Sequence, residues 1–379
     1  MNPMWLLVLV APAVIDTAVR AVLALAARRA RRPAAEPAGV SRWLVLVSAR
    51  SEGAAISPTL ESVVADRGGR AVQIVVILDG PDPDAEAVCR RFGVTTRVKE
   101  PAGPSKATVL AWAARHLGAE IAAADAVLLL DVGSALEPGF FSAFEWPKGC
   151  SAAQAILVGT GMGAGDAAAH SEHTAQEWED RGREALGWAV RLRGTGTVLT
   201  PDAFLLVAPR LRTRVEDHEA SLLLGAAGRT LVLGPPGARV RDEKPASMLG
   251  AARQRARWLA GRVAIVVRQP GALARLVRRR PVEGLAFLIE IMSRPLSLTA
   301  LARLALGAWL LGSAWAAGWV GTAVVAGAVV LASVAADAAL VFLVGHVPFR
   351  GAARLVVAWL GAVTLLPKAF GHWLGGRRA

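Results

Sequence analysis

The chain has 379 residues, 54% of them hydrophobic, and a formal net charge of +13. The two cysteines, Cys89 and Cys150, provide no disulfide framework and fit a reducing compartment. Much of the positive charge lies beside apolar segments. It therefore favours an anionic membrane surface over nucleic acid as a partner, although a bias toward Ala, Arg and Gly also explains part of the charge.

The chain begins with an apolar segment, Met4–Ala27, which is long enough to cross the roughly 30 Å core of a bilayer. Asp16 and Arg20 interrupt it four residues apart, so on a helix they share a face and can pair. The basic run at 27–33 follows the apolar segment, whereas a signal peptide carries its charge before it. Residues 1–33 are predicted to be a retained anchor with a cytoplasmic basic flank.

Residues 34–248 alternate short apolar strands with helices. The predicted strands are WLVLVSA (43–49), AVQIVVILDG (71–80), TTRVKE (95–100) and ADAVLLLDVGS (124–134). The predicted helices are ISPTLESVVAD (56–66), with Ser57 as its N-cap, DPDAEAVCRRFG (82–93) and SKATVLAWAARHLG (105–118). Strands that are apolar throughout are buried on both faces. This pattern predicts an α/β fold with a mainly parallel sheet covered by helices on both sides.

Polar residues follow three of these strands. Arg50 and Glu52 follow the first, Asp79 ends the second, and Asp131 ends the fourth. Ligands of parallel sheets bind beyond the carboxyl ends of the strands, so these residues are candidate ligand contacts. An aspartate in such a place is also a common turn former. No GxGxxG follows the first strand and no P-loop is present, which argues against a dinucleotide or P-loop site.

Residues 249–280 read as a cationic amphipathic helix at a membrane surface. Within it Gln254, Arg257 and Trp258 fall within about one turn, so they can share one face. A guanidinium offers a rigid fork for a diphosphate, and an indole offers a flat surface for a sugar. A basic helix that only lies on the membrane remains the alternative.

The C-terminal part, 281–379, is predicted to be a membrane region with about three transmembrane helices. The predicted spans are 298–319, 320–345 and 352–374, and the segment EGLAFLIEIMSRPLS (283–297) reads as a re-entrant or interfacial helix. Arg350 and Arg354 place the loop before the last span in the cytoplasm. The expected location is the cell membrane, multi-pass, with residues 34–248 in the cytoplasm.

The order of several short motifs resembles the family 2 glycosyltransferases, membrane enzymes with a GT-A nucleotide-sugar domain. The similar segments are VSARSEGAAISPTLESVV, VVILDGPDPDAEAV, GPSKATVLAWA, LLLDVGSALEPGFF, RGTGTVLTPDAF, VEDHEASLLL and QRARW. The last is similar to the family's Gln-x-x-Arg-Trp motif. The resemblance covers roughly residues 41–262 and implies an inverting hexosyltransferase. Its partners would be a nucleotide-sugar donor, a glycan or lipid-linked acceptor and membrane lipids, with no nucleic acid.

The resemblance also implies roles for individual residues. Asp217 is the candidate catalytic base, with Glu216 and Glu219 beside it. The implied substrate- and nucleotide-binding residues are Arg50, Glu52, Asp79, Asp82, Lys106, Asp131, Gly194, Gly196, Gln254, Arg257 and Trp258, and Asp84 is an alternative to Asp82. Asp131 is also the implied ligand of a divalent cation, Mg²⁺ or Mn²⁺.

The chain departs from the family at Asp131-Val132-Gly133, where the family pattern is Asp-x-Asp. Its second aspartate holds the metal, and Gly133 stands there instead. Glu137, Asp242 or Glu243 would have to replace that carboxylate, or arginines would replace the metal, so the expected metal dependence is weak or absent. This departure leaves a second interpretation open. The protein would then be a catalytically degenerate family member that binds or assembles at the membrane.

Overall fold

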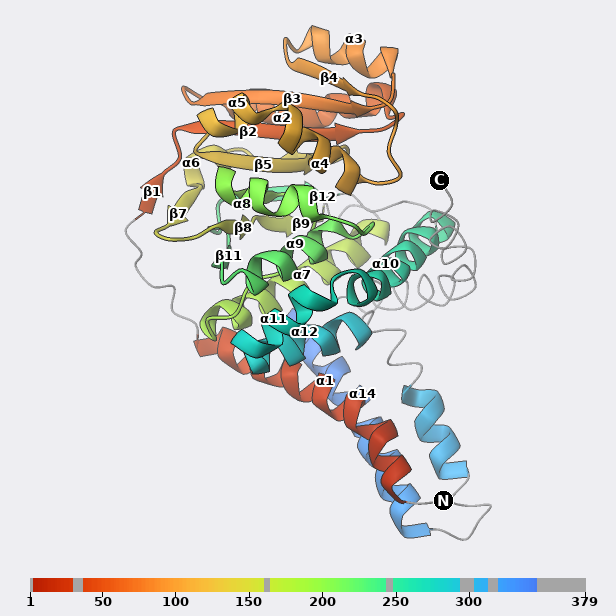
Figure 1. The fold of residues 1–379 in the computed structure, drawn as a ribbon. Coiled ribbons are helices and arrows are strands. Elements are labelled where there is room, and N and C mark those ends of the chain that lie inside the picture. The colour runs from red at the N-terminus through yellow and green to blue at the C-terminus, as the bar shows by residue number, and fades with distance from the viewer. Residues whose placement is uncertain are drawn as a thin grey trace.

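The computed structural model describes residues 3–29, 37–159, 164–242, 248–293, 303–312 and 320–345. An α/β body is built on a seven-stranded sheet, and a helical arm leads away from it (Figure 1). The predicted mainly parallel sheet is confirmed.

The strand order of the large sheet is β11-β8-β10-β5-β2-β3-β4. The bounds are β2 Arg42–Ala49, β3 Ala71–Asp79, β4 Thr95–Lys99, β5 Ala126–Asp131, β8 Ala152–Gln154, β10 Thr197–Leu199 and β11 Leu231–Leu233. All neighbours are parallel except β10, which runs antiparallel to both β5 and β8. Because β5, β2 and β3 are adjacent, their carboxyl ends meet at one edge of the sheet.

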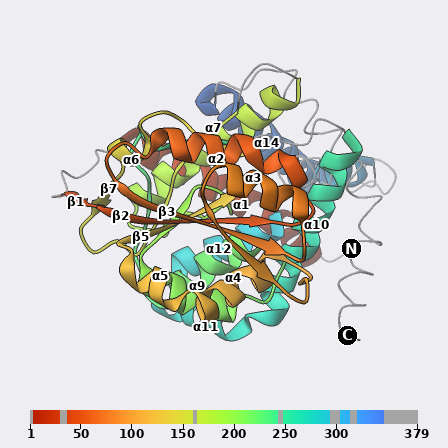
Figure 2. The ribbon, with the colours of Figure 1, turned by 90° about the horizontal axis from the view of Figure 1, so that it is seen from above.

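Helices cover both faces of this sheet (Figure 2). One face carries α2 Ser57–Asp66 and α3 Pro83–Arg91, and the other carries α4 Lys106–His116, α5 Gly118–Ala123, α8 Pro201–Val207 and α9 Glu216–Ala226. Along β2, Leu44 and Leu46 are buried on the second side and Val45 and Val47 on the first. Burial on both sides explains why the strand is continuously apolar from 43 to 47.

The predicted N-cap of α2 is wrong. A 3₁₀ turn, η1 Gly53–Ile56, leads directly into the helix, so Ile56 takes the cap position and Ser57 is the first helical residue. The Ser57 hydroxyl instead accepts a hydrogen bond from Arg91 on α3.

Smaller strands and helices complete the body. A three-stranded sheet has the order β6-β12-β9, and β1 pairs with β7. The bounds are β1 Pro37–Gly39, β6 Ser134–Leu136, α6 Phe140–Ala143, β7 Glu145–Pro147, β9 Ile156–Val158, η2 Ala208–Arg210 and β12 Arg239–Asp242. Trp43 packs edge-on against Phe140, Phe141 and Phe144, which fixes α6 on the end of the large sheet.

In the view of Figure 1, the remaining helices lie below the sheet, and α1 and α14 extend from there as the helical arm. They are α1 Pro3–Arg29, α7 Ala164–Ala185, α10 Met248–Arg268, α11 Pro270–Arg279, α12 Pro281–Ser293 and α14 Val320–Gly345, and residues 303–312 are also helical. In Figure 1, α1 and α14 run side by side out of the body, and α1 also packs against α7 and α12. The predicted Asp16–Arg20 pair forms within α1.

The structure places α12 differently from the predicted re-entrant or interfacial helix. Phe287 and Ile291 are buried in the main hydrophobic core, and the carboxylate of Glu283 accepts a hydrogen bond from the backbone of Ala189. The acidic side chains of this helix, Glu283 and Glu290, therefore contact other parts of the protein. The helix α12 belongs to the body.

The predicted membrane spans have different outcomes. The segment Met4–Ala27 forms most of α1 and 320–345 forms α14, whereas 298–319 is described only at 303–312 and 352–374 lies outside the described residues. Across the described segments, no helix is both long enough and apolar enough to cross a bilayer.

Candidate functional site

A polar pocket of about 260 Å³ opens where the carboxyl end of β5 meets α9 and α10. Its lining includes Pro104, Ser105, Lys106, Asp131, Arg193, Gly194, Thr195, Arg214, Val215, Glu216, Asp217, Asp242, Gln254, Arg257 and Trp258. These residues come from positions spread over about 150 residues of sequence. The pocket therefore brings together seven of the twelve residues that the sequence predicted for the site.

Beside this pocket, Asp79 at the end of β3 forms a second polar cluster. Its Oδ1 accepts hydrogen bonds from Lys99 Nζ at 2.8 Å and from the Gly103 backbone at 2.7 Å. Its Oδ2 lies 3.8 Å from Arg50 Nη1, which also donates to the Gly103 carbonyl at 2.6 Å. Asp79 is only 6% exposed, so its carboxylate holds the loop that leads to Lys106. Lys99, which belongs to none of the sequence motifs, supplies the buried countercharge.

The candidates Glu52 and Asp82 lie near the same edge but behave differently. Asp82 caps α3, because its Oδ1 accepts from the Ala85 backbone at 3.1 Å and its Oδ2 from the Gly53 backbone at 3.0 Å. These bonds lower the pKa of Asp82 and give it a structural task. Partial burial and the carboxylates of Asp82 and Asp131 raise the pKa of Glu52. Neither residue is part of the pocket lining.

Lys106, the first residue of α4, lies among the acidic groups of the pocket. Its Nζ donates to Asp131 Oδ1 and to the Gly194 carbonyl (3.2 Å), and it lies 3.7 Å from Glu216 Oε1. Burial opposes its charge, but the carboxylates of Asp131, Glu216 and Asp217 outweigh burial and raise its pKa. Lys106 therefore remains an ammonium at the centre of the site.

Glu216 and Asp217 begin α9, and both line the pocket. Burial, with help from Asp217 and Asp131, raises the pKa of Glu216 to about 7 against the pull of Lys106. Burial also opposes the charged form of Asp217, but His218 and Lys106 lower the pKa of Asp217 to about 2. At neutral pH the pair therefore keeps Asp217 ionised while Glu216 exchanges a proton.

The two carboxylate oxygens of Asp217 have different surroundings. Its Oδ1 accepts from the His218 backbone at 2.8 Å and lies 3.2 Å from His218 Nδ1. Its Oδ2 would lie 3.8 Å from a methyl group placed on Gly194. Because Oδ1 is held by His218, Oδ2 is the oxygen that is left available to a group in the pocket.

Glu219, predicted beside the base, is turned away from the pocket. It is fully buried and accepts hydrogen bonds from the backbones of Arg212 (2.8 and 2.9 Å) and Thr213 (2.7 Å). Its carboxylate also receives a bond from Gln269 at the end of α10. Glu219 therefore anchors the segment before α9.

The Glu216 carboxyl predicts a stability change with pH. Its folded pKa of about 7 exceeds the ordinary value of 4.5, so folding favours the protonated form. That contribution is complete below about pH 4.5 and is lost as pH rises toward 7. We expect Glu216→Gln to remove this loss, which amounts to about 3 kcal/mol.

Urea unfolding of both proteins at pH 5 and pH 7.5 measures this effect. Relative to the variant, wild type should become less stable at the higher pH. A constant difference between the two proteins would mean that Glu216 titrates near its ordinary value.

Gly194 lies beside the carboxylates of the pocket in a backbone conformation that favours glycine. Its φ is +82°, a conformation that glycine adopts without strain. A methyl group there would lie 3.5 Å from Asp131 Oδ2 and 3.8 Å from Glu216 Oε1. Gly196, predicted with it to bind substrate, instead faces Val240 and Ala155 at the edge of the core and does not line the pocket.

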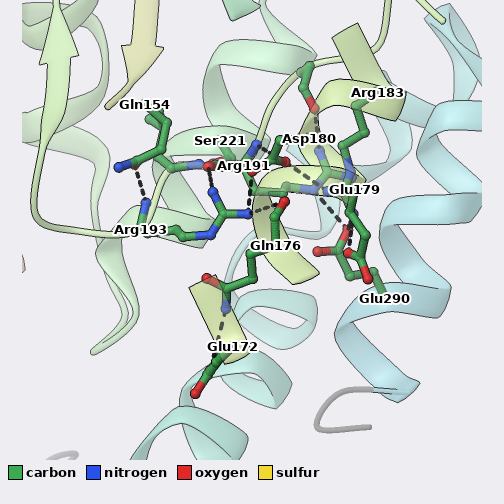
Figure 3. Close-up of polar contacts among 12 residues, drawn as sticks. Gln154, Glu172, Gln176, Glu179, Asp180, Arg183, Arg191, Arg193, Ser221 and Glu290 are labelled. Carbon is green, nitrogen blue, oxygen red and sulfur yellow. Dashed lines mark hydrogen bonds and ion pairs between the residues drawn. The ribbon is translucent and has the colours of Figure 1, made fainter. Parts of the chain in front are cut away.

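A buried ionic network holds the turn that carries Gly194 (Figure 3). The Arg193 backbone donates to Gln154 Oε1 at 2.8 Å, and Gln154 Nε2 donates to the Thr195 carbonyl at 3.0 Å. The Arg193 guanidinium pairs with Asp180, which is completely buried on α7. The Thr195 hydroxyl accepts from the Asp131 backbone at 3.2 Å. The turn is thus fixed on both sides of Gly194.

The same network extends to α12. Glu290 Oε2 lies 2.9 Å from both Arg183 Nη2 and Arg191 Nε, and Arg183 Nη1 lies 2.8 Å from Asp180 Oδ1. All these side chains are at least 86% buried. Buried charges that lose a partner are costly, so the network ties α7, α12 and the Gly194 turn into one unit.

Asp131 is the residue that best fits a divalent cation. Its side chain is 44% exposed toward the pocket, and Asp242 lines the same pocket. A cation that shares its coordination with a ligand's phosphates needs only one or two protein carboxylates, which this pair supplies. The described residues contain no group of three or more acidic, His or Cys side chains able to hold a metal by themselves.

The predicted substitutes for the missing carboxylate have separate outcomes. Glu137 pairs with Arg239 at 3.3 Å and does not line the pocket, so that prediction is wrong. Glu243 lies outside the described residues. Gly133 itself has φ +89°, so a side chain at that position would occupy a strained backbone.

The fold was compared with solved structures of other proteins. The chain is similar to mannosyltransferase PcManGT from Pyrobaculum calidifontis, solved in complex with GDP-Man and Mn²⁺. The TM-score is 0.56 at 16% identity, over 94% of this chain and 98% of that one. Glucosyl-3-phosphoglycerate synthase from Mycobacterium tuberculosis, with Mn²⁺ and UDP-glucose, has a TM-score of 0.39 at 17% identity, over 58% and 78%.

No protein-family model and no curated protein matches the chain. At 16% identity, the likeness to the mannosyltransferase extends to the fold. The chain therefore shares the α/β architecture of a nucleotide-sugar-dependent glycosyltransferase.

Proposed function

We propose that this protein is an inverting glycosyltransferase of the hexosyltransferase type. It would move a sugar from a nucleotide-sugar donor to a glycan or lipid-linked acceptor. The observation that carries this proposal is the pocket itself. On a fold shared with a mannosyltransferase, it combines an ionised carboxylate, Asp217, with the cations Lys106 and Arg257.

Each group has a task in such a transfer. Asp217 Oδ2 accepts the proton of the acceptor hydroxyl, while His218 holds the other oxygen. Lys106 and Arg257 face the charge that develops on the leaving diphosphate. Trp258 offers its ring to the sugar. A divalent cation held by Asp131 would neutralise the diphosphate further, and the Mn²⁺ of the similar mannosyltransferase structure is consistent with that cofactor.

We further assign the chain to the family 2 type, with Gln254, Arg257 and Trp258 as its Gln-x-x-Arg-Trp motif. All three line the pocket from α10, which supports a role for that helix at the active site beyond contact with a membrane. The proposed nucleoside site is the neighbouring Asp79 cluster, where Arg50 and Lys99 surround the carboxylate.

We also propose that the helical arm attaches the enzyme to a membrane, with the body on the cytoplasmic side. Large apolar side chains are exposed along it: Val14, Ile15, Val22 and Leu25 on α1, Trp309, and Val324, Val325 and Val329 on α14. Such a surface fits lipid better than water. Cell fractionation and cysteine labelling test this. A body that labels from outside the cell would contradict the orientation.

A second function has two observations in its favour. Gly133 lacks the carboxylate of Asp-x-Asp, and Lys106 already pairs with Asp131. A degenerate family member would keep the pocket for binding or assembly without turnover.

A donor screen on detergent-purified protein separates the two functions. Candidate nucleotide sugars, beginning with GDP-mannose and UDP-glucose, are tested for release of nucleoside diphosphate with and without Mn²⁺. Release that depends on Asp217 supports the enzyme. Binding without release would support the degenerate member, and no binding at all would contradict both.

A further inference from the structure

The charged side chains of the pocket divide into paired and unpaired groups. The paired ones are Lys106 with Asp131 and Glu216, Arg193 with Asp180, Asp217 with His218, and Asp242 with His173. Arg214 and Arg257 also line the pocket, and both are exposed. Within the segments that the structure describes, neither guanidinium has a hydrogen bond or an ion pair. Arg214 and Arg257 are therefore the cationic side chains of the pocket that are left available to a ligand.

The packing of α10 holds these two arginines beside one pocket. Gly261 lies against Val215, since a methyl group on Gly261 would come within 2.8 Å of the Val215 side chain. Arg257 precedes Gly261 by one helical turn and so shares its face, and Arg214 directly precedes Val215. The close contact between glycine and valine thus places both arginines at the same junction.

The C-terminal end of α10 fixes the same junction. Arg268 Nη1 donates to the Arg212 carbonyl at 2.5 Å, and Gln269 Nε2 donates to the Arg210 carbonyl at 3.1 Å. The segment before α9 is also anchored by Glu219. The backbones that carry Arg214 and Arg257 are therefore held together, while their exposed guanidinium groups stay free to meet a ligand.

We propose that Arg214 joins Arg257 in binding the diphosphate of the nucleotide-sugar donor, an inference that rests on the proposed function. A sugar diphosphate carries two negative charges, which matches two unpaired guanidinium groups. Each planar guanidinium can donate two parallel hydrogen bonds to phosphate oxygens. Arg214 is thus a donor-binding residue outside the Gln-x-x-Arg-Trp motif.

Nucleotide binding tests this without turnover. Calorimetric titrations compare a nucleoside diphosphate with the matching monophosphate, GDP with GMP and UDP with UMP, in EDTA and again with Mn²⁺. We expect Arg214→Gln and Arg257→Gln each to weaken diphosphate binding about tenfold or more. Monophosphate binding should change much less, so the preference for the diphosphate falls.

Arg253→Gln is the matched control, because Arg253 is exposed on the same helix but does not line the pocket. It should bind like wild type. If Arg214→Gln keeps the wild-type preference, the inference is wrong, even where the variant raises KM for an acceptor. If wild type binds neither diphosphate, the proposed function fails and the inference fails with it. Melting temperatures confirm that the variants are folded.

Discussion

Replacing Asp217 by asparagine is expected to slow sugar transfer by about 10²- to 10⁴-fold, the usual cost of losing a general base. The amide keeps the size of the side chain and the contact of one oxygen with the His218 backbone, but it cannot take a proton from the acceptor. Nucleotide binding should stay near the wild-type value, because the proposed diphosphate contacts lie on other residues. Release of nucleoside diphosphate measures the rate.

Glu216→Gln serves as the comparison, because Glu216 is the neighbouring carboxyl with the raised pKa of about 7. A general base works best with a pKa near the working pH, so Glu216 is the rival for this role. A larger loss in the Glu216 variant than in the Asp217 variant would transfer the role to Glu216. An Asp217→Asn protein with the wild-type rate would leave the base unassigned and favour a scaffold.

Replacing Lys106 by methionine is expected to lower activity by about 10²- to 10³-fold, comparable to the loss of one electrostatic donor at a reacting centre. The side chain keeps its length but loses the charge that lies among Asp131, Glu216 and Asp217. The three carboxylates would then repel each other and any incoming diphosphate. Both the rate and nucleotide binding should suffer, together with a lower melting temperature.

Lys148→Met is a control for the loss of a positive charge, since Lys148 is exposed and outside the pocket. It should behave like wild type. If Lys106→Met binds nucleoside diphosphate and turns over normally, the ammonium serves only to hold α4, and its assigned role in the site is wrong.

The sequence by itself determined that the central strands lie in a mainly parallel sheet covered by helices on both faces. The central residues of strands such as WLVLVSA and AVQIVVILD are continuously apolar, and only a sheet covered on both faces buries both sides. The sequence also placed Arg50, Asp79 and Asp131 at carboxyl ends of strands, and the order β5-β2-β3 makes those ends neighbours. Such patterns can be read from the sequence because the burial of a residue follows from its position in its own strand or helix.

Only the tertiary structure decided which charges meet. Nothing local distinguishes Glu219, which anchors a turn, from Glu216, which lies in the pocket three residues earlier. Asp82 is also tied to the Gly53 backbone, and Glu290 of α12 pairs with Arg191, and both of these partners are distant in sequence. Pairing depends on distances between elements, and similar carboxylates differ only in what the fold brings within a few ångströms.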